Sequence, residues 1–158
     1  MDGGEHVEER AIGTTPWHLW VIGILTLIWN AFGAWDYTQT QLQNRDYLAA
    51  MMEPMGIPVA EGITYYEAFP AWADAAWALG VWGALAGSLL LLLRSKWSIL
   101  AFTISLFGLV VTTLYTIGAP LEGASDTPMG IAFTVVIWIV TIALILYCRK
   151  MAMKNVLR

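Results

Sequence analysis

The sequence predicts an all-α protein: an integral membrane four-helix bundle with a partly helical outward loop between spans one and two. Composition is the first reason, since 58% of the 158 residues are hydrophobic and only 13% are charged. An average soluble domain has about 25% charged residues. The second reason is a set of four long apolar runs, at 17–35, 71–93, 97–117 and 131–147. A membrane-spanning helix needs about 20 mainly apolar residues, so each run is long enough to span.

The first span is expected at 17–35, after a helix start signal. Thr15 is a suitable capping residue and Pro16 suits the first helical position. The preceding residues, 1–13, are polar and contain glycine, which predicts a disordered tail. Ala31-Phe32-Gly33 also fits a signal-peptidase site, but the acidic leader and the long, Trp-rich apolar run favour an uncleaved span.

The long loop at 36–70 is expected to be partly helical. Proline and glycine residues within 52–58 divide it into two parts. The first part, 36–52, has no Gly or Pro and is expected to continue as helix. The second part is expected to form a short helix within 59–69, before Pro70 opens the second span.

Small residues on one face of spans two and three are expected to pack these two helices closely. The Gly83-x-x-x-Gly87 pattern allows helix backbones to approach each other. The connection at 94–96 is too short for anything but a tight hairpin. The pattern therefore predicts internal packing, with dimerisation through the same face as the alternative. The predicted packing residues are Gly80, Gly83, Gly87, Ser105, Gly108 and Thr112.

The fourth span is expected at 131–147, after the cap-then-proline signal Thr127-Pro128. The sequence thus divides into a membrane domain at 14–148 and a basic cytoplasmic tail at 149–158.

The distribution of positive charge predicts the orientation. Lys and Arg concentrate in cytoplasmic loops and near helix ends. Of the eight Lys and Arg residues, only Arg45 falls in a loop that is expected on the outer side. Both termini are therefore expected to be cytoplasmic, and the loop at 36–70 is expected to face outward.

The composition also argues against several functional classes. The net charge of −4 combines a basic inner face with an acidic outer face, and no basic patch indicates nucleic acid. The one cysteine, Cys148, is expected at the lipid edge and cannot form an intramolecular disulfide. Neither histidine lies in the interior of a span, which disfavours a haem held between helices. No catalytic triad, metal-ligand spacing or phosphate loop is present. We therefore predict no catalytic residue, no metal and no cofactor, and keep a membrane enzyme as the last of three hypotheses.

A polar stripe at the outer end of span one marks the candidate binding site. Its residues follow each other at steps of three or four, which places them on one helix face that is expected to run into the loop. Asn30 is the one amide within the four runs. A polar group in a bilayer must find a partner or line a wet cavity. The stripe includes Thr26, Asn30, Gly33, Tyr37, Gln41 and Asn44.

Carboxylates and aromatic residues gather at the outer mouth, near this stripe. Together with the amides they suit a small polyhydroxylated or cationic ligand. The alternative is an interfacial aromatic belt with a solvated cap. Asp36 and Asp74 are further expected either to share a proton or to act separately as helix caps or partners of Arg45. The candidate ligand-binding residues are Asn30, Trp35, Asp36, Tyr37, Gln41, Asn44, Glu67 and Asp74.

Five stretches of the sequence carry a resemblance to a known family: T-P-W-H-L-W at 15–20, W-N-A-F-G-A-W-D-Y-T-Q-T-Q at 29–41, N-R-D-Y-L at 44–48, the run at 69–92 and F-T-V-V-I-W at 133–138. On these stretches the chain resembles a family of small four-span bacterial proteins of the inner (cytoplasmic) membrane. The family occurs mainly in alphaproteobacteria and is often labelled as sugar transporters. The resemblance implies four spans, an inner-membrane location and a sugar-like solute, and it supplies no functional residues.

Two functions follow as the leading hypotheses. In the first, the protein binds or transports a small polar solute at its periplasm-facing mouth, and as four helices are few for a complete transporter, it does so as an oligomer. In the second, it is a non-transporting structural or regulatory subunit of a larger membrane complex. The expected partners are therefore the lipid bilayer, a second copy or a larger complex, and a small polar solute.

Overall fold

The computed structural model describes residues 14–121, 123 and 127–158. Within these residues it contains six α-helices, one short 3₁₀ helix and no strand, which confirms the all-α prediction. Four helices are long and apolar enough to cross a membrane, which indicates a multi-pass membrane protein. The tail predicted at 1–13 lies outside the described residues. The four long helices are α1 (Trp17–Gln41), α4 (Ala71–Leu92), α5 (Trp97–Gly118) and α6 (Pro128–Met153).

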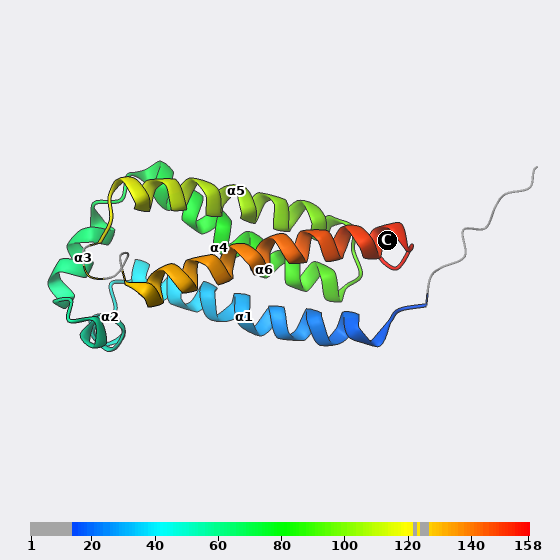
Figure 1. The fold of residues 1–158 in the computed structure, drawn as a ribbon, viewed down its shortest axis with the longest axis horizontal. Coiled ribbons are helices and arrows are strands. Elements are labelled where there is room, and N and C mark those ends of the chain that lie inside the picture. Colours follow the sequence, from blue (N-terminus) through cyan, green and yellow to red (C-terminus); the bar gives the residue numbers. More distant parts are fainter. Residues whose placement is uncertain (1–13, 122, 124–126) are drawn as a thin grey trace, which may run out of the picture.

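The four long helices lie lengthwise in a bundle, and two short helices cross one of its ends (Figure 1). Helix α4 packs against α1 and α5, whereas α6 packs mainly against α5. We call the end with the short helices the loop end, and the end where α1 begins and α6 finishes the tail end. The loop is partly helical, as predicted: it contains α2 (Arg45–Met52), the 3₁₀ helix η1 (Glu53–Met55) and α3 (Val59–Glu67).

The first helix continues past residue 35 but ends at Gln41, so the predicted unbroken helix through residue 52 is wrong. Gln43 adopts a left-handed backbone with φ of 51°. The side chain of Asn44 then accepts a hydrogen bond from the Tyr47 backbone N–H at 3.3 Å and caps α2. Asparagine is among the preferred capping residues, and capping here overrides the helical spacing. The polar stripe therefore stays on one helix only as far as Gln41.

The starts of the first and last long helices differ in how they are capped. Thr127 accepts a hydrogen bond from the Gly130 backbone N–H at 3.1 Å, and α6 begins at Pro128, which confirms the cap-then-proline start. Thr15 does not cap α1. Its hydroxyl instead accepts a hydrogen bond from Arg94 at 2.9 Å, which ties the start of α1 to the α4–α5 turn.

The small residues of α4 and α5 face each other across the closest helix contact of the bundle. A Cβ atom added to Gly108 would lie 2.5 Å from the backbone nitrogen of Gly80 and 2.8 Å from its Cα. The hydroxyl of Ser105 donates a hydrogen bond to the Gly80 carbonyl at 2.6 Å. A Cβ at Gly87 would lie 2.8 Å from the ring of Phe102. The glycine face of α4 is thus occupied by α5 within the chain.

The segment 149–158, predicted as a separate basic tail, contributes Met151, Val156 and Leu157 to the packed core at the tail end. Helix α6 continues through Met153, and the backbone then folds back beneath the bundle. The Arg158 N–H donates to the Arg94 carbonyl, and the Lys96 N–H donates to the Arg158 carbonyl, both at 2.7 Å. Cys148 is fully buried and does not lie at the lipid edge. The tail-end core consists of Leu19, Leu91, Phe102, Leu144, Cys148, Met151, Val156 and Leu157.

Candidate functional site

A cavity of about 310 Å³ lies in the loop-end half of the bundle, where it is lined by all four long helices. Its volume is at the lower end of the roughly 300–1,000 Å³ range of small-molecule sites. We call it the bundle cavity. Its walls include Asn30, Gly33 and Asp36 of α1, Trp77, Gly80 and Ala84 of α4, Ser105, Thr112, Thr113 and Thr116 of α5, and Phe133, Thr134 and Thr141 of α6.

The cavity exists because small residues face a helix that stands apart. Gly33 and Ala84 present little or no side chain, and a Cβ added to Gly33 would meet nothing within 4 Å. The loop-end half of α6 is exposed, with Phe133 at 52%. This half of α6 contacts α1 through side chains, such as the rings of Trp29 and Phe133, whose centroids are 5.9 Å apart. The backbone of α6 therefore lies close mainly to the backbone of α5.

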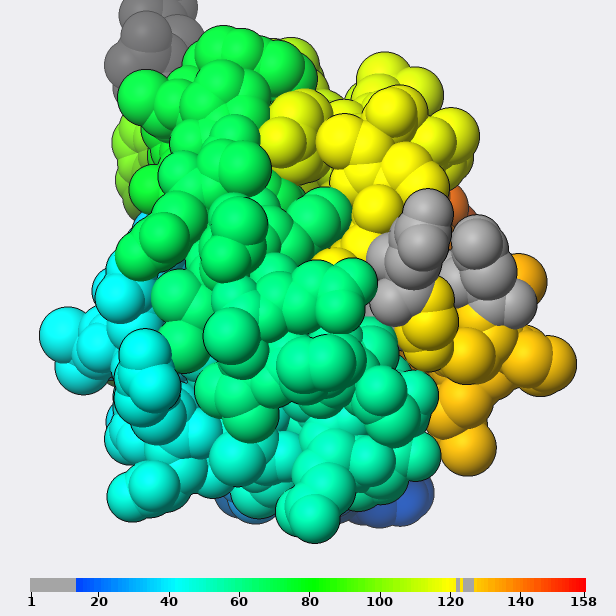
Figure 2. Space-filling model, turned by 90° about the vertical axis from the view of Figure 1, so that its left-hand side faces the viewer, coloured from blue at the N-terminus to red at the C-terminus, as the bar shows by residue number. Residues whose placement is uncertain are grey.

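A second cavity of about 670 Å³ adjoins the bundle cavity and leads toward the loop end. The two share Trp77, Thr112 and Phe133 as wall residues. The second cavity is also lined by Tyr65 and Tyr66 of α3. Seen from the loop end, the α2–α3 segment covers much of the surface, and the start of α6 stands to one side (Figure 2). The second cavity thus extends the space from the bundle cavity to the underside of the loop.

Asn30 lies in the wall of the bundle cavity and is fixed by α4. Its side-chain N–H group donates to the Ser88 hydroxyl at 2.8 Å and to the Ala84 carbonyl at 3.3 Å. Among the described residues no donor reaches its side-chain oxygen. The Asn30 side chain thus uses its N–H group within the protein, and its oxygen is available to accept a hydrogen bond from a ligand or from water.

Thr112 supplies a second polar atom without a partner. Its hydroxyl oxygen is buried and forms no hydrogen bond in the described part of the chain. The other cavity hydroxyls are engaged: Thr134 donates to the Gly130 carbonyl at 3.0 Å, and Thr141 donates to the Ile137 carbonyl at 2.8 Å. A buried hydroxyl without a partner is costly, and Thr112 lines the bundle cavity, so rotation of its side chain would bring this hydroxyl to a bound molecule.

Asp36 is the one carboxylate among the described cavity-wall residues. The Tyr47 hydroxyl donates to its Oδ1 at 2.5 Å. Burial, and then the hydrogen bond to Asp36, raises the pKa of Tyr47. Burial, followed by the charge of Asp36, raises the pKa of Tyr66 to about 12. Both phenols therefore keep their protons at neutral pH and remain hydrogen-bond donors on the loop side of Asp36.

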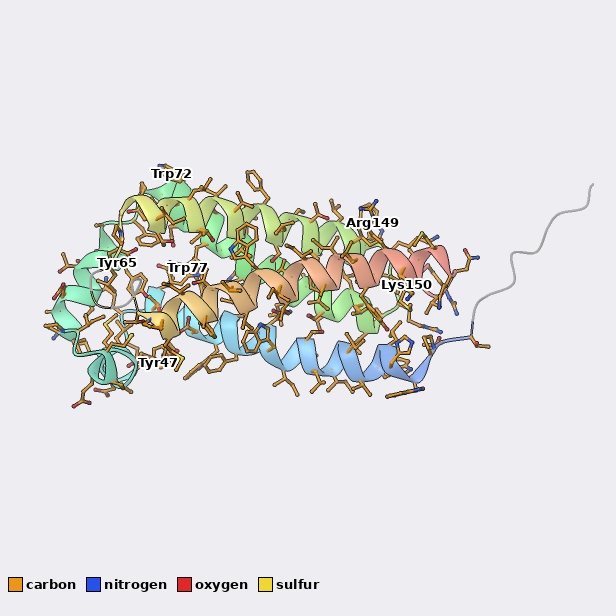
Figure 3. The ribbon with its side chains drawn as sticks, in the orientation of Figure 1. Tyr47, Tyr65, Trp72, Trp77, Arg149 and Lys150 are labelled. Carbon is orange, nitrogen blue, oxygen red and sulfur yellow. The ribbon has the colours of Figure 1, made fainter. Side chains whose placement is uncertain are left out.

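Aromatic rings hold Trp77 in place above the cavity. The Tyr66 ring stacks on Trp77 with centroids 5.5 Å apart, and Tyr37 meets it edge-on at 4.9 Å. Figure 3 shows Trp77 in the loop-end half of the bundle, with Tyr47 and Tyr65 nearer to the loop. Trp35 and Trp72 are about half exposed, at 48% and 57%. Trp77 thus belongs to the cavity, while Trp35 and Trp72 have the exposure expected of an interfacial belt.

The remaining candidate residues lie at the loop end outside the bundle cavity. Gln41 donates a hydrogen bond to Asp74, and Gln43 donates to Glu67 at 2.7 Å. Asp36 and Asp74 have different partners, and no contact between them supports a shared proton. Of the eight candidate ligand-binding residues, the structure places Asn30 and Asp36 in the cavity wall, and Tyr37 supports the wall through Trp77. Trp35, Gln41, Asn44, Glu67 and Asp74 are not wall residues.

Sequence reasoning missed most of the wall that α5 and α6 contribute. Thr112 and Ser105 were placed on the inward face of span three, but as packing residues. Thr113 was not selected, although it accepts a hydrogen bond from the Trp138 indole at 3.3 Å. The signal was present in the hydroxyls of spans three and four, which repeat on one helix face. This repeat of hydroxyl-bearing residues does not distinguish hydroxyls that are packed between helices from hydroxyls that face a cavity.

No group of three or more potential metal ligands occurs among the described residues. Comparison with protein families, with curated proteins and with solved structures found no match for this chain. The resemblance to sugar-transporter-labelled proteins therefore stays a prediction from the sequence.

Proposed function

We propose that this protein binds a small polar solute within the bundle cavity, which in a membrane is reached from the loop end. The observation that carries this proposal is the cavity itself, with the unpartnered Thr112 hydroxyl and the open acceptor side of Asn30 in its wall. A bundle that only packed would gain by filling this space, because empty volume forfeits dispersion contacts. Passage of the solute across the membrane would need a moving partner helix or a second copy.

A bacterial inner-membrane location with both termini in the cytoplasm is part of the same proposal. Support comes from the basic residues, which gather at the tail end. Arg149 and Lys150 lie at the end opposite the α2–α3 loop (Figure 3). Arg94 and Lys96 lie in the turn that holds Arg158 at the same end. Basic residues mark the cytoplasmic side, so the loop end would face the periplasm.

Single-cysteine labelling tests this orientation. Cys148 is replaced by alanine, and one exposed residue at each end is replaced by cysteine: Glu53 at the loop end or Lys154 at the tail end. An impermeant maleimide is expected to label Glu53→Cys in intact spheroplasts, and Lys154→Cys only after the membrane is opened. The reverse pattern would reject the proposed orientation.

Filling the cavity tests the binding function. Gly33→Phe places a ring in open space within the wall. We expect it to abolish solute binding without lowering the unfolding temperature. The measurement is the thermal shift of protein in nanodiscs with glucose, sucrose, choline or benzylamine. A solute at about 100 times its Kd stabilises a protein by about 2.7 kcal/mol, which such a shift detects.

Gly118→Phe is the matched control for this test. A Cβ at Gly118 also meets nothing within 4 Å, and this residue lines neither cavity. The control should respond to the solute as the wild type does. The proposal fails if no solute of the panel shifts the wild type, or if Gly33→Phe responds as strongly as the control.

The alternative function, a non-transporting structural or regulatory subunit, has less support from the structure than from the sequence. The glycine face of α4 is not free to dock a partner protein, because it packs against α5 within the chain. The α2–α3 layer at the loop end is the surface that this alternative would still use. Co-purification of a stoichiometric larger membrane partner in mild detergent would favour it.

A further inference from the structure

Asp36 is a partly buried carboxylate without a cationic partner. Its one hydrogen-bond donor among the described residues is the neutral Tyr47 hydroxyl, and none of the described Lys, Arg or His side chains pairs with it. The nearest basic residue along the chain, Arg45, is exposed. An ionised carboxylate away from bulk water is costly unless a positive charge or several donors compensate it.

The cavity wall holds two acceptors with free capacity, whereas several of its donors are engaged. Asp36 and the side-chain oxygen of Asn30 are both available to accept. The Thr112 hydroxyl, which has no partner, can either donate or accept. Other donors are used within the protein, because the Asn30 N–H group bonds to α4, and Ser105 donates to a backbone carbonyl. Thr116 and Thr134 likewise donate to backbone carbonyls. A neutral sugar needs donors and acceptors in similar numbers, whereas an ammonium group only donates.

Four aromatic residues also contribute to the wall. Trp29 and Phe32 of α1, Trp77 of α4 and Phe133 of α6 line the same cavity as Asp36. Aromatic faces attract an organic cation through the negative face of the ring, and they also bury an apolar body. The cavity would hold about ten water molecules at roughly 30 Å³ each, which matches a ligand with one ring and a short chain.

We propose that the solute is a small organic cation, whose ammonium group pairs with Asp36 and whose apolar body lies against Trp29, Trp77 and Phe133. This inference rests on the proposed function, since it names the class of molecule for the same cavity. It selects the cationic class from the two ligand classes that the sequence suggested, and it sets the polyhydroxylated class aside.

The test compares two probes with the same carbon skeleton, 2-phenylethylammonium and 2-phenylethanol. Radiolabelled probe is dialysed to equilibrium at pH 7 against the protein in phosphatidylcholine nanodiscs, with empty nanodiscs subtracted. The wild type is expected to bind the ammonium probe saturably and at least about tenfold more tightly than the alcohol, because a charge pair near a protein surface exceeds the 1.4 kcal/mol that tenfold requires.

The charge of Asp36 is tested with variants. Asp36→Asn should weaken binding of the ammonium probe at least about tenfold and leave binding of the alcohol unchanged. Asp36→Glu keeps the charge and should retain most of the affinity. Asp46→Asn is the control: it removes an exposed carboxylate at the same end and should bind as the wild type does. If Asp36→Asn does not fold, the comparison of the two probes on the wild type decides the matter.

The possible failures are distinguishable. If glucose binds the wild type in the cavity and the ammonium probe does not, the inference is overturned and the proposed function stands. Equal affinity of the wild type for the two probes, or of wild type and Asp36→Asn for the ammonium probe, also overturns it. If no solute binds and Gly33→Phe changes nothing, both proposals fall.

Discussion

Phe102→Ala is expected to lower the free energy of unfolding by about 3–5 kcal/mol, the usual cost of truncating a fully buried phenylalanine. The Phe102 side chain is 0% exposed and lies in the tail-end core. Its ring also fills the space that Gly87 leaves on α4. The substitution therefore empties volume that two helices share, and rigid helix backbones collapse poorly into such a gap. The measurement is unfolding by SDS titration in mixed micelles.

Phe107→Ala is the matched control for this prediction. Phe107 lies on the same helix, but its side chain is 62% exposed on the surface of the bundle. Its truncation removes a side chain that the protein hardly packs, so we expect a change within about 0.5 kcal/mol. Equal losses for the two variants would show that Phe102 does not hold the tail end together.

Gly108→Ala is expected to destabilise the protein by about 2 kcal/mol, although alanine is the better helix former by about 1 kcal/mol. The added Cβ would lie 2.5 Å from the Gly80 nitrogen and would also collide with the Ala76 carbonyl. Both contacts are with backbone, which cannot rotate away as a side chain does. Helices α4 and α5 would have to separate, and the hydrogen bond from Ser105 to Gly80 would lengthen.

Gly33→Ala separates this clash from helix propensity. Gly33 is also a mid-helix glycine, and an added Cβ there meets nothing within 4 Å. Its replacement should leave stability unchanged or raise it by up to about 1 kcal/mol. The prediction is contradicted if Gly108→Ala is as stable as Gly33→Ala in the same titration.

Much of the fold was readable from the sequence because bilayer crossing imposes simple requirements on length and polarity. The four apolar runs and the short helix α3 appear close to the expected positions, and Thr127-Pro128 marks the start of α6. The break at Gln43 was not predicted, because the spacing of the stripe fits one helix and the capping role of Asn44 competes with it. The fold-back of Val156 and Leu157 depends on the geometry of the 94–96 turn, which periodicity does not describe.

The candidate site was predicted in part, for a related reason. Asn30 stood out because an amide inside an apolar run needs a partner, and Asp36 was selected for its charge near the mouth. The opposite wall, with Thr112, Thr113 and Phe133, depends on how far α6 stands from α4. That separation follows from the packing of whole helices, and no single residue type in α6 signals it.

The bundle cavity lies between two packed regions that share no residue with its wall. The tail-end core centres on Phe102 and Leu157, and the loop-end cluster consists of Leu48, Met52, Ile57 and Leu121. Apart from Gly80 and Ser105, which also pack α4 against α5, the wall residues can therefore change while both regions stay intact. On the proposed function, such a scaffold would tolerate changes of ligand preference over evolutionary time, because the wall and the two packed regions are made of different residues.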